Sequence, residues 1–214
     1  MRHGPGGWTL AGELMAGVVW CPGGPSAVPT ELRPLPGPRL IVAARYTSSP
    51  VGPYLEMAVA EPARFGSRPA MCVTTMVVDS AESRTSGRQR WGFPKELATL
   101  SWSVAGKERS LRWEERGVVI GWTTIGPALP AVMPLACLQQ RAGVPMWVPG
   151  RVRASAELAR VELVVPAGDD LSHLAGPHLG AHFSGASLRI GEGRPLTAAE
   201  PTHRAAPEPG STGS

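Results

Sequence analysis

One of the two lysines in this chain lies in a segment that can supply a nucleophile. Lys95 ends the run Gly87–Lys95, GRQRWGFPK, in which Trp91 and Phe93 are its apolar neighbours. Basic charge elsewhere comes almost wholly from arginine, so solubility does not require a lysine here. An exposed lysine, with a pKa near 10.4, is neutral in only about one part in two thousand at pH 7. Burial disfavours the ammonium form, so a desolvated Lys95 is a candidate nucleophile toward a carbonyl group.

Pro94 is expected to hold this lysine in a defined position. Proline lacks a backbone N–H and pushes the preceding residue, Phe93, toward an extended conformation, which favours a kink over a mobile loop. The side chains expected to desolvate the amine are those of Trp91, Phe93 and Met133. The alternative is that a lysine after a proline faces solvent at the start of a strand. Spacing alone leaves both possibilities open.

Short strands must position this segment. The 26 glycines and 23 prolines divide the chain into short pieces, and apolar or alternating runs fill the intervals. Residues 105–109 and 116–117 have the length of turns, so the three strands around them are expected to form an antiparallel meander. A short helix is possible at 169–175, where two aspartates open it. Strands are predicted at residues 14–20, 40–46, 54–60, 71–78, 98–104, 110–114, 118–124, 152–156, 159–165 and 181–190.

A chain of 214 residues with this pattern fits one mainly β domain. We expect residues 1–196 to form a closed or nearly closed antiparallel sheet with few short helices. Such barrels hold one small ligand among their inward side chains. Residues 197–214 are rich in Pro, Ala, Ser, Thr and Gly with almost no large apolar residue, so a disordered tail is expected there.

Charge and hydropathy argue against two classes of partner. The net charge is +4, but the arginines are scattered and often lie beside glutamates, as in Trp113–Arg116, so nucleic acid is not an expected partner. The sequence has no run of about eighteen apolar residues and no signal-peptide core at its beginning, which predicts no membrane span and a cytoplasmic protein.

Cysteine and histidine give no support for a metal site. The three cysteines, Cys21, Cys72 and Cys137, are odd in number and widely spaced among apolar residues, which favours reduced core thiols. His178 and His182 are four residues apart, which is the spacing of one helical face, but Gly180 between them favours a loop entering a strand. No metal is therefore expected.

Two segments resemble the acetoacetate decarboxylase family. They are Gly87–Ala98, GRQRWGFPKELA, and Tyr46–Glu56, YTSSPVGPYLE. The resemblance implies a cone-shaped antiparallel β-barrel, a homo-oligomer, and chemistry without a cofactor. The resemblance further implies that Lys95 forms a Schiff base with a small β-keto acid and that Glu56 orients the substrate or shuttles a proton. The expected function is decarboxylation of an acetoacetate-like substrate.

The resemblance also indicates a substrate pocket around the lysine. Arg88 is the family-matched arginine, which either holds a structural ion pair or contacts the substrate carboxylate. The other substrate-binding residues expected are Tyr54, Trp91, Phe93 and Met133.

Three departures from the family pattern keep alternatives open. Glu96 stands where well-known members carry a second lysine, Gln89 replaces an acidic residue, and the stretch from Trp8 to Cys21 offers no arginine for the substrate carboxylate. Alternation along a strand predicts that Glu96 points away from the pocket. The alternatives are a Schiff-base aldolase or dehydratase acting on a pyruvate-like keto acid, and a barrel that binds a small ligand without catalysis.

Overall fold

Strands dominate the computed structural model, which describes residues 7–21 and 24–197. The helical elements of this part of the chain are one α-helix, α1 (Ala81–Trp91), and one 3-10 turn, η1 (Ser172–Leu174). The protein is therefore mainly β, as predicted. The strands are β1 (Trp8–Val19), β2 (Arg33–Pro34), β3 (Arg39–Ser48), β4 (Tyr54–Phe65), β5 (Arg68–Val78), β6 (Lys95–Leu97), β7 (Leu100–Ala105), β8 (Glu108–Trp113), β9 (Val118–Thr124), β10 (Leu129–Arg141), β11 (Val144–Val164), β12 (Gly176–Ile190) and β13 (Arg194–Pro195).

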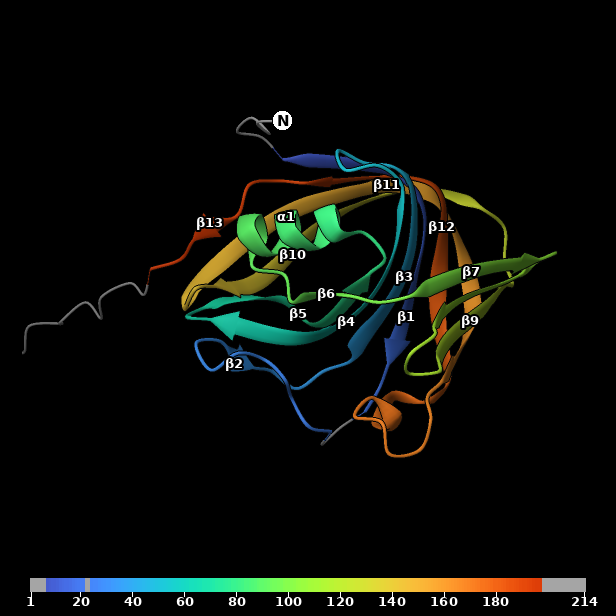
Figure 1. Ribbon diagram of the computed structural model, residues 1–214, viewed down its shortest axis with the longest axis horizontal. Coiled ribbons are helices and arrows are strands. Elements are labelled where there is room, and N and C mark those ends of the chain that lie inside the picture. Colours follow the sequence, from blue (N-terminus) through green and yellow to red (C-terminus); the bar gives the residue numbers. More distant parts are fainter. Residues whose placement is uncertain (1–6, 22–23, 198–214) are drawn as a thin grey trace, which may run out of the picture.

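These strands belong to one sheet, which closes into a ring at one end of the molecule. The order of the sheet is β10-β5-β4-β3-β1-β12-β11-β9-β8-β7, and β10 also pairs with β11. Strands β10, β5, β4, β3, β1, β12 and β11 therefore surround an interior, and α1 lies at this end of the molecule, packed against β6, β10 and β5 (Figure 1). Pairing between the named strands is antiparallel except for β10 with β5 and β5 with β6. The ring agrees with the expected barrel-like fold.

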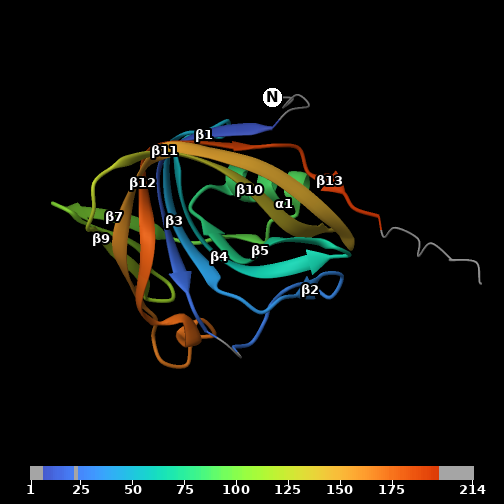
Figure 2. The same ribbon diagram turned by 180° about the vertical axis from the view of Figure 1, so that it is seen from behind.

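The predicted meander forms the other end of the sheet. Strand β8 pairs antiparallel with both β7 and β9, and β9 also pairs antiparallel with β11. Gly106 and Gly117 lie in the turns with φ of 63° and 62°, a left-handed conformation that glycine adopts without strain. Figure 2, the view from behind, shows strands β7 and β9 of the meander on the opposite side of the molecule from α1.

Strands β3 and β4 of the ring bury both of their faces. Residues on one face, such as Ala44 and Ala58, belong to the ring core, whereas Ala43 and Met57 on the other face belong to the meander core. Period-two alternation accounts for this division. The ring core consists of Trp8, Leu10, Leu14, Ala44, Tyr46, Tyr54, Ala58, Ala60, Val73, Met76, Val78, Trp91, Phe93, Met146, Val148, Val152, Phe183, Ala186 and Leu188. The meander core consists of Met15, Val19, Ile41, Ala43, Met57, Val59, Val77, Leu100, Leu111, Val118, Ile120, Trp122, Ala159, Val161, Leu163, Leu171 and Leu174.

Helix α1 is the main element that the sequence analysis did not predict. Ser80 caps its start, because the Ser80 side chain accepts a hydrogen bond from the Ser83 N–H. Glu82 lies in the first turn, where its charge complements the helix dipole. Gly92 ends the helix in a left-handed conformation, and its N–H donates to the Arg88 carbonyl. The helix has no wide apolar stripe, so hydrophobic periodicity does not indicate it.

Strands β10 and β11 correct the predicted boundaries. No strand is predicted at 129–141, and within 144–164 only 152–156 and 159–165 are predicted, whereas each region forms one continuous strand. Pro130 and Pro134 fit into β10 because this strand pairs with β5 only at Cys137 and Leu138, which leaves most of its second edge without a partner strand. The predicted helix at 169–175 is the single turn η1.

The remaining predictions about the chain have mixed outcomes. The cysteines are free, and burial raises the pKa of the Cys72 thiol to about 12 and that of Cys137 to about 11. Neither helical element of the described residues is long and apolar enough to cross a membrane. A disordered tail is predicted at 197–214, and residues 198–214 lie outside the described part of the chain.

Candidate active site

The backbone after α1 delivers Lys95 to the inside of the ring. Past the helix end, the Phe93 N–H donates to the Gly87 carbonyl, and the Lys95 N–H donates to the Phe93 carbonyl across Pro94. That three-residue turn is the kink expected at this proline. Lys95 then begins β6, where it pairs in parallel with Met76 of β5. Two fixed neighbours, the helix and the strand, thus position the lysine.

The amine of Lys95 is buried and fully engaged. The residue is only 4% exposed. Its Nζ donates to Glu56 Oε2 at 2.7 Å and to Ser83 Oγ at 2.9 Å. The same nitrogen lies 5.2 Å from the centre of the Tyr54 ring, within the range of a cation–π contact. Lys95 and Glu56, predicted from separate segments of the sequence, therefore meet inside the ring.

Glu56 occupies the face of β4 that looks into the ring, between Tyr54 and Ala58 of the ring core. Its second oxygen, Oε1, accepts a hydrogen bond from the Tyr46 hydroxyl at 3.3 Å. Burial, together with the negative charge of Glu56, raises the pKa of Tyr46 and that of Tyr54 far above the usual value. Both phenols therefore remain protonated, and the Tyr46 hydroxyl remains a donor to the carboxylate.

One face of α1 makes room for the lysine side chain. Ser83, Gly87 and Trp91, at a spacing of four residues, are the buried positions of this helix. Ser83 reaches the amine, and Gly87 lies beneath the alkyl chain of the lysine. A Cβ atom at Gly87 would lie 2.7 Å from Lys95 Cδ and 2.8 Å from Cε, which is closer than packed carbon atoms approach. A Cβ atom at position 87 would therefore force the Lys95 side chain to shift.

Glu96 and Arg88 lie outside the site. Glu96 points away from the ring, as strand alternation predicts, and forms ion pairs with Arg88 at 3.1 Å and with Arg84 at 3.6 Å. These three side chains are 40–56% exposed. Of the two roles considered for Arg88, the structure therefore has the ion pair, and it does not bring this residue to Lys95. Arg88 follows Gly87 in the helix, so its side chain leaves the helix about 100° away from the lysine.

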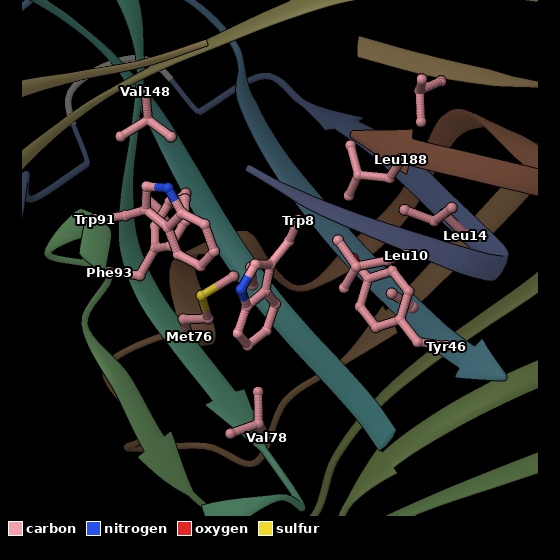
Figure 3. Close-up of a cluster of buried hydrophobic side chains, with 14 of the residues drawn as sticks. Trp8, Leu10, Leu14, Tyr46, Met76, Val78, Trp91, Phe93, Val148 and Leu188 are labelled. Atoms are coloured by element: carbon pink, nitrogen blue, oxygen red, sulfur yellow. The ribbon is translucent and has the colours of Figure 1, made fainter. Parts of the chain in front are cut away.

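Aromatic side chains form the walls on the helix side of the interior. Trp91 and Phe93 are buried, with ring centres 5.9 Å apart, and Trp8 meets Trp91 edge-on at 5.2 Å (Figure 3). The Trp91 indole N–H donates to the Gly191 carbonyl at 2.8 Å, so its polar atom is satisfied. Met133 of β10 is partly buried against the same core. The four predicted wall residues, Tyr54, Trp91, Phe93 and Met133, thus share one interior.

Three polar residues of this interior were not predicted from the sequence. Tyr46 was part of the quoted motif but received no role, and Gln139 lies on a strand that was not predicted. Ser83 could have been found from the helix caps, because the Ser80 cap and Gly92 mark a helix in which Ser83, Gly87 and Trp91 share one face.

A groove of about 710 Å³ lies away from Lys95, across β7, β8, β9, β11 and β12. Its floor includes Ser103, Ser110 and Gly121, which are register neighbours on adjacent strands. Glu108 and Arg160 also line it, but the lysine and its carboxylate partner are elsewhere. Chemistry, rather than the size of the groove, therefore places the candidate active site inside the ring.

The two histidines do not form a metal site. Both lie on strand β12, where His178 Nε2 bonds the Leu174 carbonyl at 2.8 Å and His182 Nε2 approaches Glu13 at 3.3 Å. Within residues 7–21 and 24–197, no cluster of three or more potential metal ligands occurs.

Comparison with known proteins agrees with the fold. The family model for acetoacetate decarboxylase (ADC) matches residues 26–173. MppR, an enduracididine biosynthesis enzyme complexed with pyruvate, is 19% identical, with 92% of each chain covered and a TM-score of 0.67. MppR complexed with the condensation product of pyruvate and imidazole 4-carboxaldehyde is 18% identical over 90% of each chain, with a TM-score of 0.60.

An acetoacetate decarboxylase from Legionella pneumophila is 16% identical, with 92% of each chain covered and a TM-score of 0.64. No curated protein sequence matches the chain. The family model spans more than half of the sequence, and it includes both the lysine segment and the Glu56 segment. The chain therefore belongs to the acetoacetate decarboxylase family.

Proposed function

We propose that the protein is a cofactor-free Schiff-base lyase that decarboxylates a small, acetoacetate-like β-keto acid through an imine on Lys95. The observation that carries this proposal is the 2.7 Å contact between Lys95 Nζ and Glu56 Oε2 inside the ring. A lysine beside a single carboxylate, enclosed by apolar walls, is one proton transfer away from a free amine. The two carboxyl oxygens and the amine also form a ready path for a proton.

Imine formation uses both members of the pair. Glu56 takes a proton from the Lys95 ammonium, and the neutral amine attacks the ketone carbon of the substrate. The resulting carbinolamine loses water, for which protonated Glu56 donates the proton, and an iminium ion remains. Ser83 and the Tyr54 ring hold the nitrogen in place, because both contact it before the substrate arrives.

Loss of carbon dioxide follows from the charge on the iminium nitrogen. The bond between the substrate α-carbon and its carboxylate breaks, and its electron pair moves into the iminium to form a neutral enamine. Glu56, which is a carboxylate after the dehydration step, takes up a proton from solvent water and is placed to deliver it to the enamine carbon, after which water hydrolyses the imine and releases a ketone. Apolar walls favour this step, because a carboxylate and a cation become neutral molecules.

A second candidate is aldol or dehydration chemistry on a pyruvate-like keto acid. The likeness to MppR complexed with pyruvate favours it, because the same imine on Lys95 also activates pyruvate as an enamine. The two functions share every step up to the imine. They differ in the bond that breaks afterwards, so product analysis separates them.

The experiment is borohydride trapping with acetoacetate and with pyruvate, followed by intact mass and peptide mapping. The expected result is substrate-dependent reduction at Lys95, with release of carbon dioxide from acetoacetate in the absence of borohydride. Lys107 is an internal control, because it lies exposed in the turn between β7 and β8. Trapping with pyruvate alone would favour the second candidate, and labelling with neither substrate would favour a barrel that binds ligands without catalysis.

A further inference from the structure

Among the buried polar side chains inside the ring, one stands without a partner. Besides Tyr46 and Tyr54, the buried polar or charged side chains of the described residues that face this interior are those of Glu56, Ser83, Lys95 and Gln139. Of these four, the first three meet at Lys95 Nζ. Gln139 is 2% exposed, and its Nε2 has no hydrogen-bond partner. An unpaired buried donor destabilises a fold, so its presence requires an explanation.

Strand alternation turns Gln139 into the ring. Gln139 pairs with Met146 of the ring core, and Cys137, two residues earlier on β10, packs against the same core. Leu138, between them, belongs to a different cluster with Leu32. Successive side chains of a strand point to opposite faces, so Gln139 shares the inner face with Cys137.

The backbone holds Gln139 at the same end of the interior as the lysine segment. The carbonyl of the next residue, Gln140, lies against Gly92, three residues before Lys95. Met146, opposite Gln139 on β11, lies with Trp91 beside Gly193. The free amide thus enters the interior next to the aromatic wall that precedes the nucleophile.

We propose that the Gln139 carboxamide receives the carboxylate of the substrate whose ketone carbon reacts with Lys95. This inference rests on the proposed function. Among the described residues, Arg39 is the only buried arginine, and it pairs with Glu61 rather than facing the ring interior. The Gln139 N–H group is therefore the free donor for an anionic oxygen.

A neutral donor suits a carboxylate that must leave as carbon dioxide. A guanidinium would stabilise the negative charge of the bound substrate, and that stabilisation would be lost as the charge moves to the iminium. A single free donor also limits the substrate to one carboxylate, because a second would be buried without a partner. The substrate class is therefore a short monocarboxylic oxo acid, and acetoacetate is preferred over oxaloacetate.

Binding of butyrate tests Gln139 without depending on imine formation, since butyrate has the carboxylate but no ketone. Ligand-observed NMR titration would compare the wild-type protein with Gln139→Leu and Gln139→Glu. Gln140→Leu is the matched control, because it is the same change one residue away on the opposite face. We expect Gln139→Leu to weaken butyrate binding by about tenfold or more, Gln139→Glu to abolish it, and Gln140→Leu to leave it unchanged.

The outcomes separate this inference from the proposed function. Equal weakening in Gln139→Leu and Gln140→Leu, no change in Gln139→Leu, or no butyrate binding by the wild type would each overturn the role of Gln139. Thermal unfolding provides the check on folding, because Gln139→Leu removes an unpaired donor at similar volume and should not lower the melting temperature. Failure of borohydride trapping at Lys95, with butyrate binding dependent on Gln139, would instead refute the lyase and leave a carboxylate-binding site.

Discussion

Two buried acid–base pairs occupy opposite faces of the same sheet. In the ring, Lys95 and Glu56 are both almost fully buried at 2.7 Å, and within the described residues Glu56 has no other ion-pair partner. On the meander side, His182 is equally buried, but its partner Glu13 retains 22% exposure. Glu13 also lies within ion-pair distance of Arg45 and Arg109.

The difference between the pairs lies in how completely each acid is neutralised. Glu13 lies near three cationic or basic groups, so a network stabilises its negative charge. Loss of any one of these contacts removes only part of that stabilisation. Glu56 faces one amine and one phenol in a buried position, so transfer of one proton converts the whole pair to neutral groups. The first arrangement fixes a structure, whereas the second is suited to moving a proton.

Replacing Lys95, the proposed nucleophile, should have the largest effect on the ring pair. Lys95→Met should abolish borohydride trapping and reduce turnover by roughly a thousandfold or more. It also leaves Glu56 buried without its cation, so the free energy of unfolding should fall by about 3–5 kcal/mol. Chemical denaturation with trapping assays would measure both effects, and Lys107→Met, the change at the other lysine, should alter neither.

The double variant Lys95→Met with Glu56→Leu distinguishes the two losses. Replacing a buried ion pair by apolar residues is often neutral for stability, so the double variant should recover the free energy of unfolding but no activity. A Lys95→Met protein that still forms a reducible adduct would exclude Lys95 as the nucleophile.

Exchanging each acid for its amide compares the two pairs directly. Glu56→Gln keeps a hydrogen-bond acceptor for Lys95 but cannot carry a proton, so kcat should fall by about 10²–10⁴-fold. Glu13→Gln, the matched change on the opposite face, should lower stability and leave kcat near the wild-type value. Steady-state kinetics and thermal unfolding of both variants provide the test, and an equal loss of kcat in both would end the distinction between a catalytic and a structural pair.

A smaller change can misplace the amine while both charges remain. In Gly87→Ala the new methyl group collides with Lys95 Cδ and Cε, so the amine should shift by a fraction of an ångström to about an ångström, and kcat/KM should fall by about a hundredfold. Gly126→Ala is the control, because a Cβ there makes only ordinary contacts with Leu158. Similar kinetics for the two variants would show that the path of the lysine over the helix is not critical.

The sequence indicated the segments that carry Lys95 and Glu56 more readily than the elements that hold them. The strands of the meander were predicted because alternation and short turns are local signals, and β9 was predicted with its observed bounds. Helix α1 was missed because its buried face consists of a serine, a glycine and a tryptophan instead of an apolar stripe. Lys95 and Glu56 were identified from the resemblance of their segments, but their contact depends on the closure of the ring, which is a long-range property.

The residues that complete the site were the hardest to predict. Gln139 lies on β10, whose prolines hide the strand, and its inward direction follows from the pairing of β10 with β11. Ser83 looks like an ordinary residue of a polar segment until the caps define the helix. In both cases the role depends on the direction of a side chain. That direction cannot be inferred when the strand or helix that carries the residue is not predicted.

The pH dependence of stability that comes from His182 should be the smallest of these effects. Burial, reinforced by Arg109 and opposed by Glu13 and Glu157, lowers the pKa of His182 below its usual value. The unfolded chain then binds a proton near pH 6.5 that the folded protein takes up only at lower pH. The stability that His182 contributes is therefore complete above about pH 6.5 and is lost as the pH falls through the lowered pKa.

Replacing this histidine should flatten the response. His182→Gln should be less stable than the wild type at pH 8, yet should lose less stability between pH 8 and pH 5, as measured by denaturant unfolding. Trapping at Lys95 at pH 8 should remain, because the imidazole lies on the opposite face from the amine. Parallel pH profiles in the two proteins would show that groups other than His182 cause the acid sensitivity. Asp169 is not one of them in this range, since Arg116 holds its pKa below the usual value despite partial burial, so its contribution is lost only at lower pH.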